Sequence, residues 1–459
     1  MKTIFMTIYD GAIAKNLLRT DFWKVLKVKN DLRVVLFATP DKAPYYREKF
    51  GAKNVFIESL PRDEFNKNII YRIFTELVLN SIHTNTVKIR QYNRFFISRG
   101  NFPKRLILWV LRRIIWYLGA LKIWRNFLRF IYKFFASASF APYFDKYQPD
   151  LVFAPNMVST EDSQILLEAK KRNIKTLGMI KSWDNLTSKT FILVRPDKLI
   201  VHNPKIKEEA AKYGDFPVEN IFISGIPQYD FYLRKDVILP REDFFRNFNL
   251  DPQKKLIFFC APGDIYAPDD EENIDILHRY FKEGKIQHPV NVLISIHPKY
   301  NFKTNSFEDK YSPFVFVRIG TYPKEALSAW EFEDKDIVYL INCLYHSDIV
   351  INTASTMTIE ACIFDRPVIN IAFDGYKKRN YWTSVRRFCD YNHYSNLIKT
   401  GGVRVARSKE ELFLHISQYL SDPKLDSEGR RKIAEGQLYR LNDQAGGGIG
   451  NFLLELLYQ

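Results

Sequence analysis

The stretch SDIVINTASTMTIEACIFDRPVINIAFD, residues 347–374, decides the fold class of this chain. Its run from Ile349 to Asn352 carries no charge, which predicts a strand buried in a parallel sheet. Helical spacing follows, with Met357 and Ala361 on one side, and a second strand is expected from Val368 to Phe373. The stretch therefore predicts a strand, turn, helix and strand of an α/β protein.

The turn of this unit is rich in hydroxyl side chains, which belong to Thr353, Ser355, Thr356 and Thr358. The first free amides of the helix and its positive end would lie beside them, and such groups together bind phosphate. We therefore expect an anion site at this turn. The alternative is that Ser355 or Thr356 only caps an ordinary helix.

Length and composition set the limits for the rest of the chain. A chain of 459 residues exceeds what one hydrophobic core usually covers, so two domains are expected. The four cysteines stand singly, without metal-binding spacing, which indicates buried thiols in the cytoplasm. No uninterrupted apolar run approaches the roughly 18 residues of a transmembrane helix.

Strand and helix patterns alternate in both halves of the chain, which predicts two doubly wound parallel sheets. We expect a first domain at residues 1–235, a second at 252–435, and a C-terminal helix at 436–459 that packs back on the first domain. Ligand loops of such sheets lie at the carboxyl ends of the strands.

In the first half, two such loops carry polar side chains. Asp10 and Gly11 follow the first strand, and Trp183, Asp184 and Asn185 follow a later one. Asp10 and Asp184 are the candidate general bases, and the other three residues would contact an acceptor. The alternatives are a helix cap for Asp10 and a structural turn for the second loop.

In the second half, three loops contain Gly263, His297 with Lys299, and Ser355. All three should leave one edge of one parallel sheet, where a phosphorylated ligand could touch them together. His297 is then a candidate phosphate ligand or proton donor. A lone histidine before a proline can also be purely structural.

Most of the net charge of +16 lies in one region, because residues 77–144 contain twelve Lys or Arg and no Asp or Glu. Such a region implies an anionic partner, either phospholipid or nucleic acid. Nucleic acid is disfavoured because no nucleic-acid-binding motif accompanies the charge. We expect a membrane-associating insertion at about residues 88–140. Its cationic face is predicted to consist of Lys122, Arg125, Arg129 and Lys133, and the alternative is a helix packed on the core with a solvated basic face.

The second half resembles GT-B glycosyltransferases, and within them CDP-glycerol glycerophosphotransferases and capsule or surface-carbohydrate transferases. The similar pieces are FFCAPGDIY, SIHPKY and SDIVINTASTMTIEACIFDRPVI, whereas similarity before about Lys254 is weak. Two departures put the CDP-glycerol donor in doubt: Gly263-Asp264 replaces a Thr-Trp pair that is usual in the family, and Thr353-Ala354 replaces an Asp-Tyr pair.

The resemblance implies two Rossmann-like domains with a cleft between them. It implies a donor site in which Ser355 and Thr356 bind the diphosphate, His297 contacts the same phosphates and Glu360 holds the ribose. Gly263, Lys299 and Met357 complete the predicted donor-binding set, and we expect no metal or other cofactor.

Taken together, these features predict a cytoplasmic enzyme on the inner face of the cell membrane. It would move a sugar from a nucleotide-sugar donor to a glycan or lipid-linked acceptor in surface polysaccharide biosynthesis. The alternatives are a CDP-glycerol-type polyol-phosphate transferase, an enzyme resembling UDP-sugar 2-epimerases, and a non-enzymatic membrane- or nucleic-acid-binding protein.

Overall fold

The computed structural model describes residues 1–62, 65, 69–263, 266–297, 309–320, 333–440, 442 and 444–459. The chain divides into two compact units. Unit 1 contains Met1–Leu233 together with Leu438–Gln459, and unit 2 contains Arg234–Gln437. The C-terminal segment therefore belongs to the same unit as the N-terminus, although more than two hundred residues separate them in the chain.

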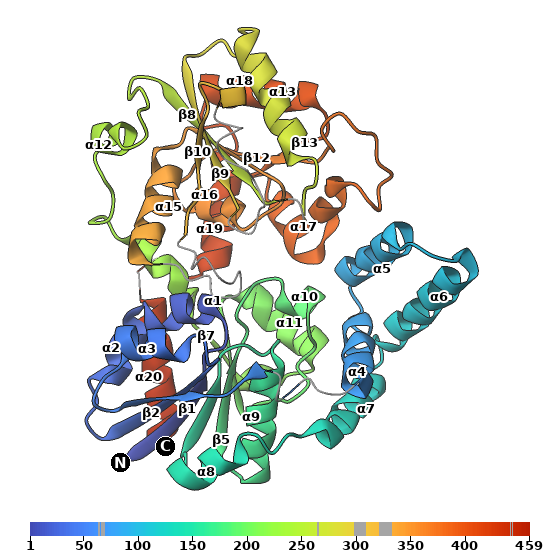
Figure 1. Ribbon diagram of the computed structural model, residues 1–459, viewed down its shortest axis with the longest axis vertical. Coiled ribbons are helices and arrows are strands. Elements are labelled where there is room, and N and C mark those ends of the chain that lie inside the picture. Colours follow the sequence, from blue (N-terminus) through green and yellow to red (C-terminus); the bar gives the residue numbers. More distant parts are fainter. Residues whose placement is uncertain are drawn as a thin grey trace. The chain divides into compact units, whose positions relative to one another are not determined.

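Unit 1 is built on a parallel sheet that has seven strands within the described residues, in the order β3-β2-β1-β4-β5-β6-β7. The strands are β1 (Lys2–Thr7), β2 (Leu32–Ala38), β3 (Val55–Ser59), β4 (Leu151–Ala154), β5 (Lys175–Met179), β6 (Lys198–Val201) and β7 (Ile221–Ile223). Alternate side chains of β1 enter different cores: Phe5 packs on one face and Ile4 and Met6 on the other. Helices cover both faces, which explains why the central strands are apolar throughout (Figure 1).

The helices of unit 1 form two groups. Helices α2, α3 and α20 contribute to the core that contains Ile4, and α4, α7, α8 and α9 contribute to the core that contains Phe5. The bounds are α1 (Gly11–Ile13), a π-helical turn (Ala14–Leu18), α2 (Asp21–Lys27), α3 (Ala43–Phe50), α4 (Ile69–Asn80), α5 (Asn85–Ile97), α6 (Phe102–Leu118), α7 (Lys122–Tyr132), α8 (Ala141–Tyr147), α9 (Thr160–Lys171), α10 (Asn185–Ser188), α11 (Pro204–Gly214) and α20 (Ala445–Tyr458), with 3-10 turns at Lys133–Phe135, Val218–Asn220 and Pro227–Leu233.

Unit 2 contains a second parallel sheet, with six strands among the residues described and the order β10-β9-β8-β11-β12-β13. The strands are β8 (Lys255–Ala261), β9 (Val290–Ile296), β10 (Val315–Val317), β11 (Ile349–Asn352), β12 (Val368–Ile371) and β13 (Arg404–Ala406). The helices are α12 (Arg241–Arg246), α13 (Asp270–Lys282), α15 (Asp334–His346), α16 (Met357–Ile363), α17 (Asn392–Ile398), α18 (Lys409–Ser421) and α19 (Ser427–Leu438), with a 3-10 turn at Val385–Asp390.

The stretch at residues 347–374 folds as predicted, as β11, α16 and β12. Strand β11 has the predicted bounds, and β12 ends at Ile371 rather than Phe373. The helix begins only at Met357, because Ala354 adopts a left-handed backbone conformation with φ +46° that interrupts helical geometry. The prediction of two Rossmann-like parallel sheets is confirmed.

Candidate functional site

Three loops of unit 2 leave its sheet at the same edge. Strand β8 lies between β9 and β11, and all three run parallel. The loops that follow these strands contain Gly263, His297 and Ser355. The amide of His297 donates a 3.1 Å hydrogen bond to the carbonyl of Ala261, and Gly263 has φ +93°, which residues with a side chain rarely adopt. The three loops therefore start from neighbouring strand ends, while Lys299 lies outside the described residues.

The two predicted phosphate-binding hydroxyls behave differently. The Oγ of Ser355 accepts a 3.2 Å hydrogen bond from the amide of Met357 and donates one of 3.3 Å to Asn352. Thr356 is the N-cap residue of α16, and Ser355 precedes it and holds the first amide of the helix, which is a structural role. The Thr356 side chain is exposed and makes no capping hydrogen bond. Of the two hydroxyls, that of Thr356 is the better placed to meet a ligand, whereas Glu360, the predicted ribose ligand, is buried.

Sequence reasoning missed the buried polar network that holds this turn. Asn352 ends β11 and pairs in register with Asn370 of the neighbouring strand β12, and Nδ2 of Asn370 donates to Oδ1 of Asn352 at 3.0 Å. The same Oδ1 accepts from the amide of Ser355 at 3.0 Å. Thr358 and Tyr394 join the network through hydroxyls 2.6 Å apart. The signal in the sequence was the Ile-Asn pair that occurs in both strands, and the network fixes the turn because unpaired buried polar groups are costly.

Asp10, at the carboxyl edge of the unit 1 sheet, is both a helix cap and half of an ion pair. Its Oδ1 accepts from the amide of Ala12 at 3.0 Å, and its Oδ2 lies 2.5 Å from Nζ of Lys181. Burial raises the pKa of Asp10, but the charge and hydrogen bond of Lys181 outweigh burial and lower it overall. A lowered pKa makes Asp10 a weak general base. Gly11 is the first residue of α1.

The loop that contains Trp183, Asp184 and Asn185 is tied down by internal contacts. Asp184 pairs with Lys189 at 2.8 Å, and the buried Asn185 accepts a 3.1 Å hydrogen bond from the amide of Ser182. Trp183 packs against the core of unit 1. These contacts give the loop a structural role, which was the alternative to acceptor binding. An acceptor role for its side chains stays a prediction.

The sequence did not indicate Glu209, a buried carboxyl on α11, which packs against α10. Burial is the main reason that its pKa is raised from 4.5 to about 8, and the nearby charges of Glu208 and Asp184 add to the shift. A carboxyl with such a pKa is mostly protonated at neutral pH and can donate a proton there. The shift comes from tertiary packing, which local sequence cannot reveal.

We expect Glu209→Gln to change how stability depends on pH. The folded wild type keeps this carboxyl protonated up to about pH 8, whereas the unfolded chain ionises near 4.5. This carboxyl therefore makes the wild type lose stability as pH rises between these values, and the variant lacks that contribution. Urea unfolding gives the free energy of unfolding at about pH 5 and about pH 8. The value for the variant, relative to the wild type, should be higher at about pH 8. Glu219→Gln, an exposed carboxyl elsewhere in unit 1, is the control, and parallel curves for wild type and Glu209→Gln would contradict the assignment.

The predicted cationic face of α7 is wrong for two of its four residues. The side chains of Arg125 and Arg129 are only 11% and 10% exposed, and both pair with Asp215, at 2.5 and 2.8 Å. They therefore do not face a lipid surface. Lys122 and Lys133 are exposed. Asp215 lies 86 and 90 positions further along the chain, so the helical pattern of α7 could not reveal the partner.

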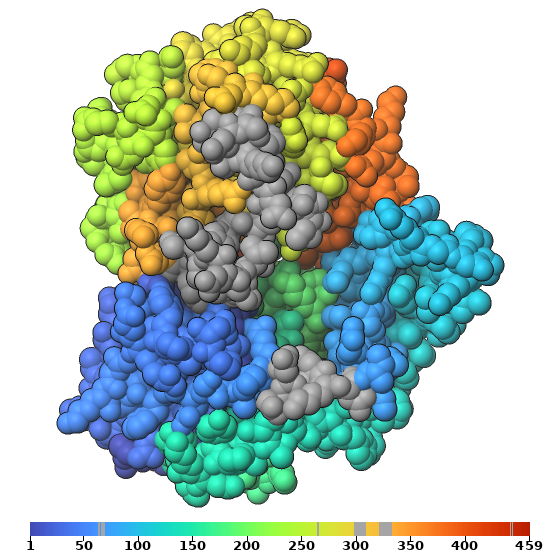
Figure 2. All heavy atoms as spheres, in the orientation of Figure 1, coloured from blue at the N-terminus to red at the C-terminus, as the bar shows by residue number. Residues whose placement is uncertain are grey.

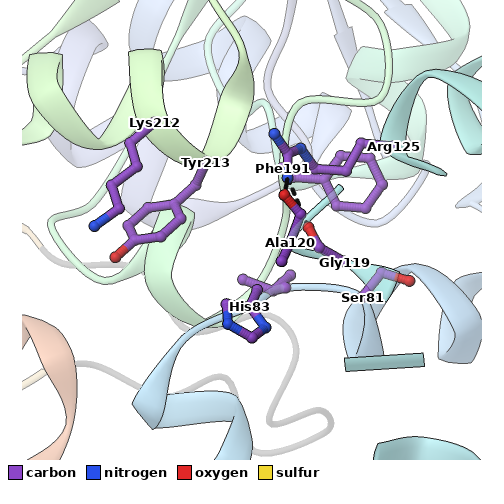
Figure 3. A pocket seen from close by; sticks show the side chains of 9 residues that line it. Ser81, His83, Gly119, Ala120, Arg125, Phe191, Lys212 and Tyr213 are labelled. Atoms are coloured by element: carbon purple, nitrogen blue, oxygen red, sulfur yellow. Dashed lines mark hydrogen bonds between the residues drawn. The ribbon is translucent and has the colours of Figure 1, made fainter. Parts of the chain in front are cut away.

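A cavity of about 170 Å³ lies in unit 1 beside the turn between α6 and α7. Lys212 and Tyr213 of α11 line one side, and Gly119 and Ala120 of the turn line another (Figure 3). Of the predicted site residues, only Arg125 lines it, and this guanidinium already donates to the carbonyls of Gly119 and Ala120. The cavity is thus separate from the strand-end loops of unit 1.

Within the described residues, no three His, Cys, Asp or Glu side chains are grouped so that they could hold a metal ion. In the same part of the chain, no helix combines the length and apolarity needed to span a bilayer.

Comparison with solved structures establishes the fold class. The S. aureus MnaA–UDP structure matches with a TM-score of 0.54 and 13% identity over 100% of this chain and 98% of that one. A UDP-GlcNAc 2-epimerase from Neisseria meningitidis bound to UDP-GlcNAc matches with 0.54 and 11%, over 99% and 100%. A glycosyltransferase from Rickettsia africae matches with 0.50 and 11%, over 99% of both chains.

These matches span almost the whole chain, and the protein therefore has the GT-B fold, as predicted. At such low identity the likeness shows the fold alone. No family model matches the sequence, and no curated protein matches it.

Proposed function

We propose that the protein is a glycosyltransferase that moves a sugar from a nucleotide-sugar donor to a glycan or lipid-linked acceptor in surface polysaccharide biosynthesis. The observation that carries the proposal is the meeting of the Gly263, His297 and Ser355 loops at one strand edge of unit 2. Ligands of open α/β sheets bind at such edges. The GT-B neighbours that were solved with UDP and UDP-GlcNAc support a UDP-sugar as the donor.

In this proposal the unit 2 edge stabilises the nucleoside diphosphate as it leaves. Thr356 and the amides of its turn would donate to the phosphates, and His297 would meet the negative charge that develops as the sugar departs. The buried network around Asn352 holds the turn rigid, so little reorganisation is needed during the reaction. We place the enzyme in the cytoplasm, on the inner face of the cell membrane, where a lipid-linked acceptor would be found.

A sugar 2-epimerase is the second candidate, because several of the GT-B neighbours are UDP-GlcNAc 2-epimerases. The two reactions differ in what happens without an acceptor. An epimerase converts the donor sugar on its own, whereas a transferase leaves the sugar configuration intact and releases UDP when acceptor is added. NMR spectroscopy of UDP-GlcNAc incubated with the protein, with and without a membrane extract that supplies acceptors, separates the two. Formation of a 2-epimer without acceptor would overturn the transferase proposal.

We expect His297→Asn to lower kcat by about a hundredfold while Tm stays at the wild-type value, because a group that acts on developing charge stabilises the transition state more than the fold. His288→Asn, a substitution elsewhere in unit 2, is the matched control and should leave kcat unchanged. Steady-state kinetics with thermal melting measures both effects. A variant with near-native kcat would show that His297 is structural.

A further inference from the structure

Helix α6 lies on the surface of unit 1, and many of its apolar side chains face outward. None of its residues is buried, and it packs against α5 and α4 at the edge of unit 1 (Figures 1 and 2). A surface helix normally shows the opposite arrangement, with apolar side chains toward the protein. Most of the outward side chains recur at helical spacing, namely Phe102, Leu106, Ile107, Val110, Leu111, Ile114 and Tyr117, and Leu108 is exposed beside them.

The inward side of α6 carries Trp109, which packs against Tyr92 of α5, and Trp116, which packs against the core of unit 1. Arginines lie beside these two rings. Arg105 donates a hydrogen bond to the carbonyl of Phe95 on α5 and stacks over the ring of the same residue. Arg113 lies 4.3 Å from the ring centre of Trp116 and donates a 3.4 Å hydrogen bond to Gln91 of α5. Carbonyl and aromatic partners therefore hold these cations within the helix pair. The apolar face stays 39% to 63% exposed, although its end residues Phe102 and Tyr117 also contact protein rings.

Helix α7 and the turn that follows it also expose an apolar stripe. Ile123, Phe127, Phe130 and Phe134 follow one another at intervals of four, three and four residues, which places them on one stripe. They are between 50% and 78% exposed. The opposite side packs into unit 1 through Leu128 and Tyr132, and through Arg125 and Arg129, which pair with Asp215.

We propose that the outward apolar faces of α6 and α7 insert into the interfacial layer of an anionic membrane and lie parallel to its surface. Side chains of this size fit the boundary between headgroups and acyl chains. The charge of this region favours an anionic membrane, because residues 77–144 contain no acidic side chain that would repel an anionic surface. Exposed lysines, Lys104, Lys122 and Lys133, lie next to the stripes, where their stems can reach the headgroups.

This attachment differs from the one expected from sequence, since the apolar stripes and not a continuous cationic face form the contact. Binding should therefore persist in part at high salt, because screening weakens only the lysine contribution. The inference rests on the proposed function, in which a lipid-linked acceptor requires a membrane surface, and it names the part of the protein that meets that surface.

Flotation of the full-length protein with vesicles tests the proposal. The vesicles contain phosphatidylcholine alone or with about 30% phosphatidylglycerol. The test variant is Ile107→Asp/Leu111→Asp/Ile114→Asp, which places charges on the outward face of α6. Its partition into anionic vesicles should fall at least about tenfold, whereas Lys122→Glu/Lys133→Glu should mainly lose the preference for anionic over neutral vesicles. Val218→Asp/Leu414→Asp changes exposed apolar residues outside the region and should bind as the wild type does.

Two results would overturn the proposal. The first is wild-type flotation of the α6 variant. The second is a wild-type dimer, seen by light scattering without vesicles, that the α6 substitutions convert to monomers, because the face would then be covered by a second copy. Cooperative melting and wild-type nucleotide affinity of the variant show that it is folded. If the wild type failed to bind nucleotide, the proposed function would be contradicted. The flotation result would still test the membrane proposal by itself.

Discussion

Asp215→Asn should lower the free energy of unfolding by about 3 to 5 kcal/mol, because it leaves Arg125 and Arg129 buried without a counter-charge. Asparagine is the suitable replacement, since Asp215 has φ +52° and asparagine tolerates this left-handed conformation. The loss therefore reports the missing charge and not backbone strain. Urea unfolding followed by circular dichroism measures it.

The exposed pair Lys205–Glu208, also on unit 1, is the matched control for this prediction. Glu208→Gln should leave the unfolding curve unchanged, because solvent-exposed pairs contribute little. An Asp215→Asn variant as stable as the wild type would mean that the two arginines do not hold α7 to unit 1.

The pH dependence of stability gives an independent check on the role of the Asp215 carboxylate. Burial raises the pKa of Asp215, but hydrogen bonds from Arg125 and Arg129 outweigh burial and hold the pKa below its ordinary value of 3.8. The stability from this carboxylate is therefore complete above the ordinary pKa and is lost as pH falls through the lowered one. The destabilisation caused by Asp215→Asn should shrink in that acidic range.

Ser355→Ala/Thr356→Ala should weaken binding of a nucleoside diphosphate by about 3 to 6 kcal/mol before water compensates, since a hydrogen bond to a charged group is removed and the turn whose amides meet the phosphates is loosened. The structure assigns the two hydroxyls different parts in this loss. Thr356 would act directly, and Ser355 would act by holding the turn through Met357 and Asn352. Isothermal titration calorimetry with UDP measures the affinity.

The single variants distinguish the direct role of Thr356 from the structural role of Ser355. Thr356→Ala should weaken binding with little change in stability, because its side chain is exposed. Ser355→Ala should change both, because its hydroxyl is bonded inside the turn. Ser395→Ala/Thr400→Ala, which removes two hydroxyls that bond to backbone carbonyls in and after α17, is the control. Loss of affinity in the control would show a general effect on unit 2.

The fold could be predicted from the sequence because its signals are local. The charge-free run Ile349–Asn352 needs only a neighbouring strand on each side to become buried, and the structure supplies β8 and β12. The shared edge of the Gly263, His297 and Ser355 loops followed from the parallel sheet alone. Helix starts were less certain, since the late start of α16 depends on the backbone of one residue, Ala354.

The parts of the site that escaped prediction depend on contacts between distant residues. Lys181 lowers the pKa of Asp10 from 171 positions away, and burial by packing raises that of Glu209. The same reason explains the error in α7. Arg125 and Arg129 have a helical pattern typical of a lipid-facing surface, but a distant acidic partner draws them inward.

The central claim is that the strand edge of unit 2 binds the diphosphate of a nucleotide sugar through the Ser355–Thr356 turn. Calorimetric titration of the full-length protein with UDP and UDP-GlcNAc, compared with Ser355→Ala/Thr356→Ala, tests it most directly. The account predicts saturable binding by the wild type and at least about a hundredfold weaker binding by a variant that still melts cooperatively. Equal affinity in the two proteins, or no binding of either nucleotide by the wild type, would contradict it.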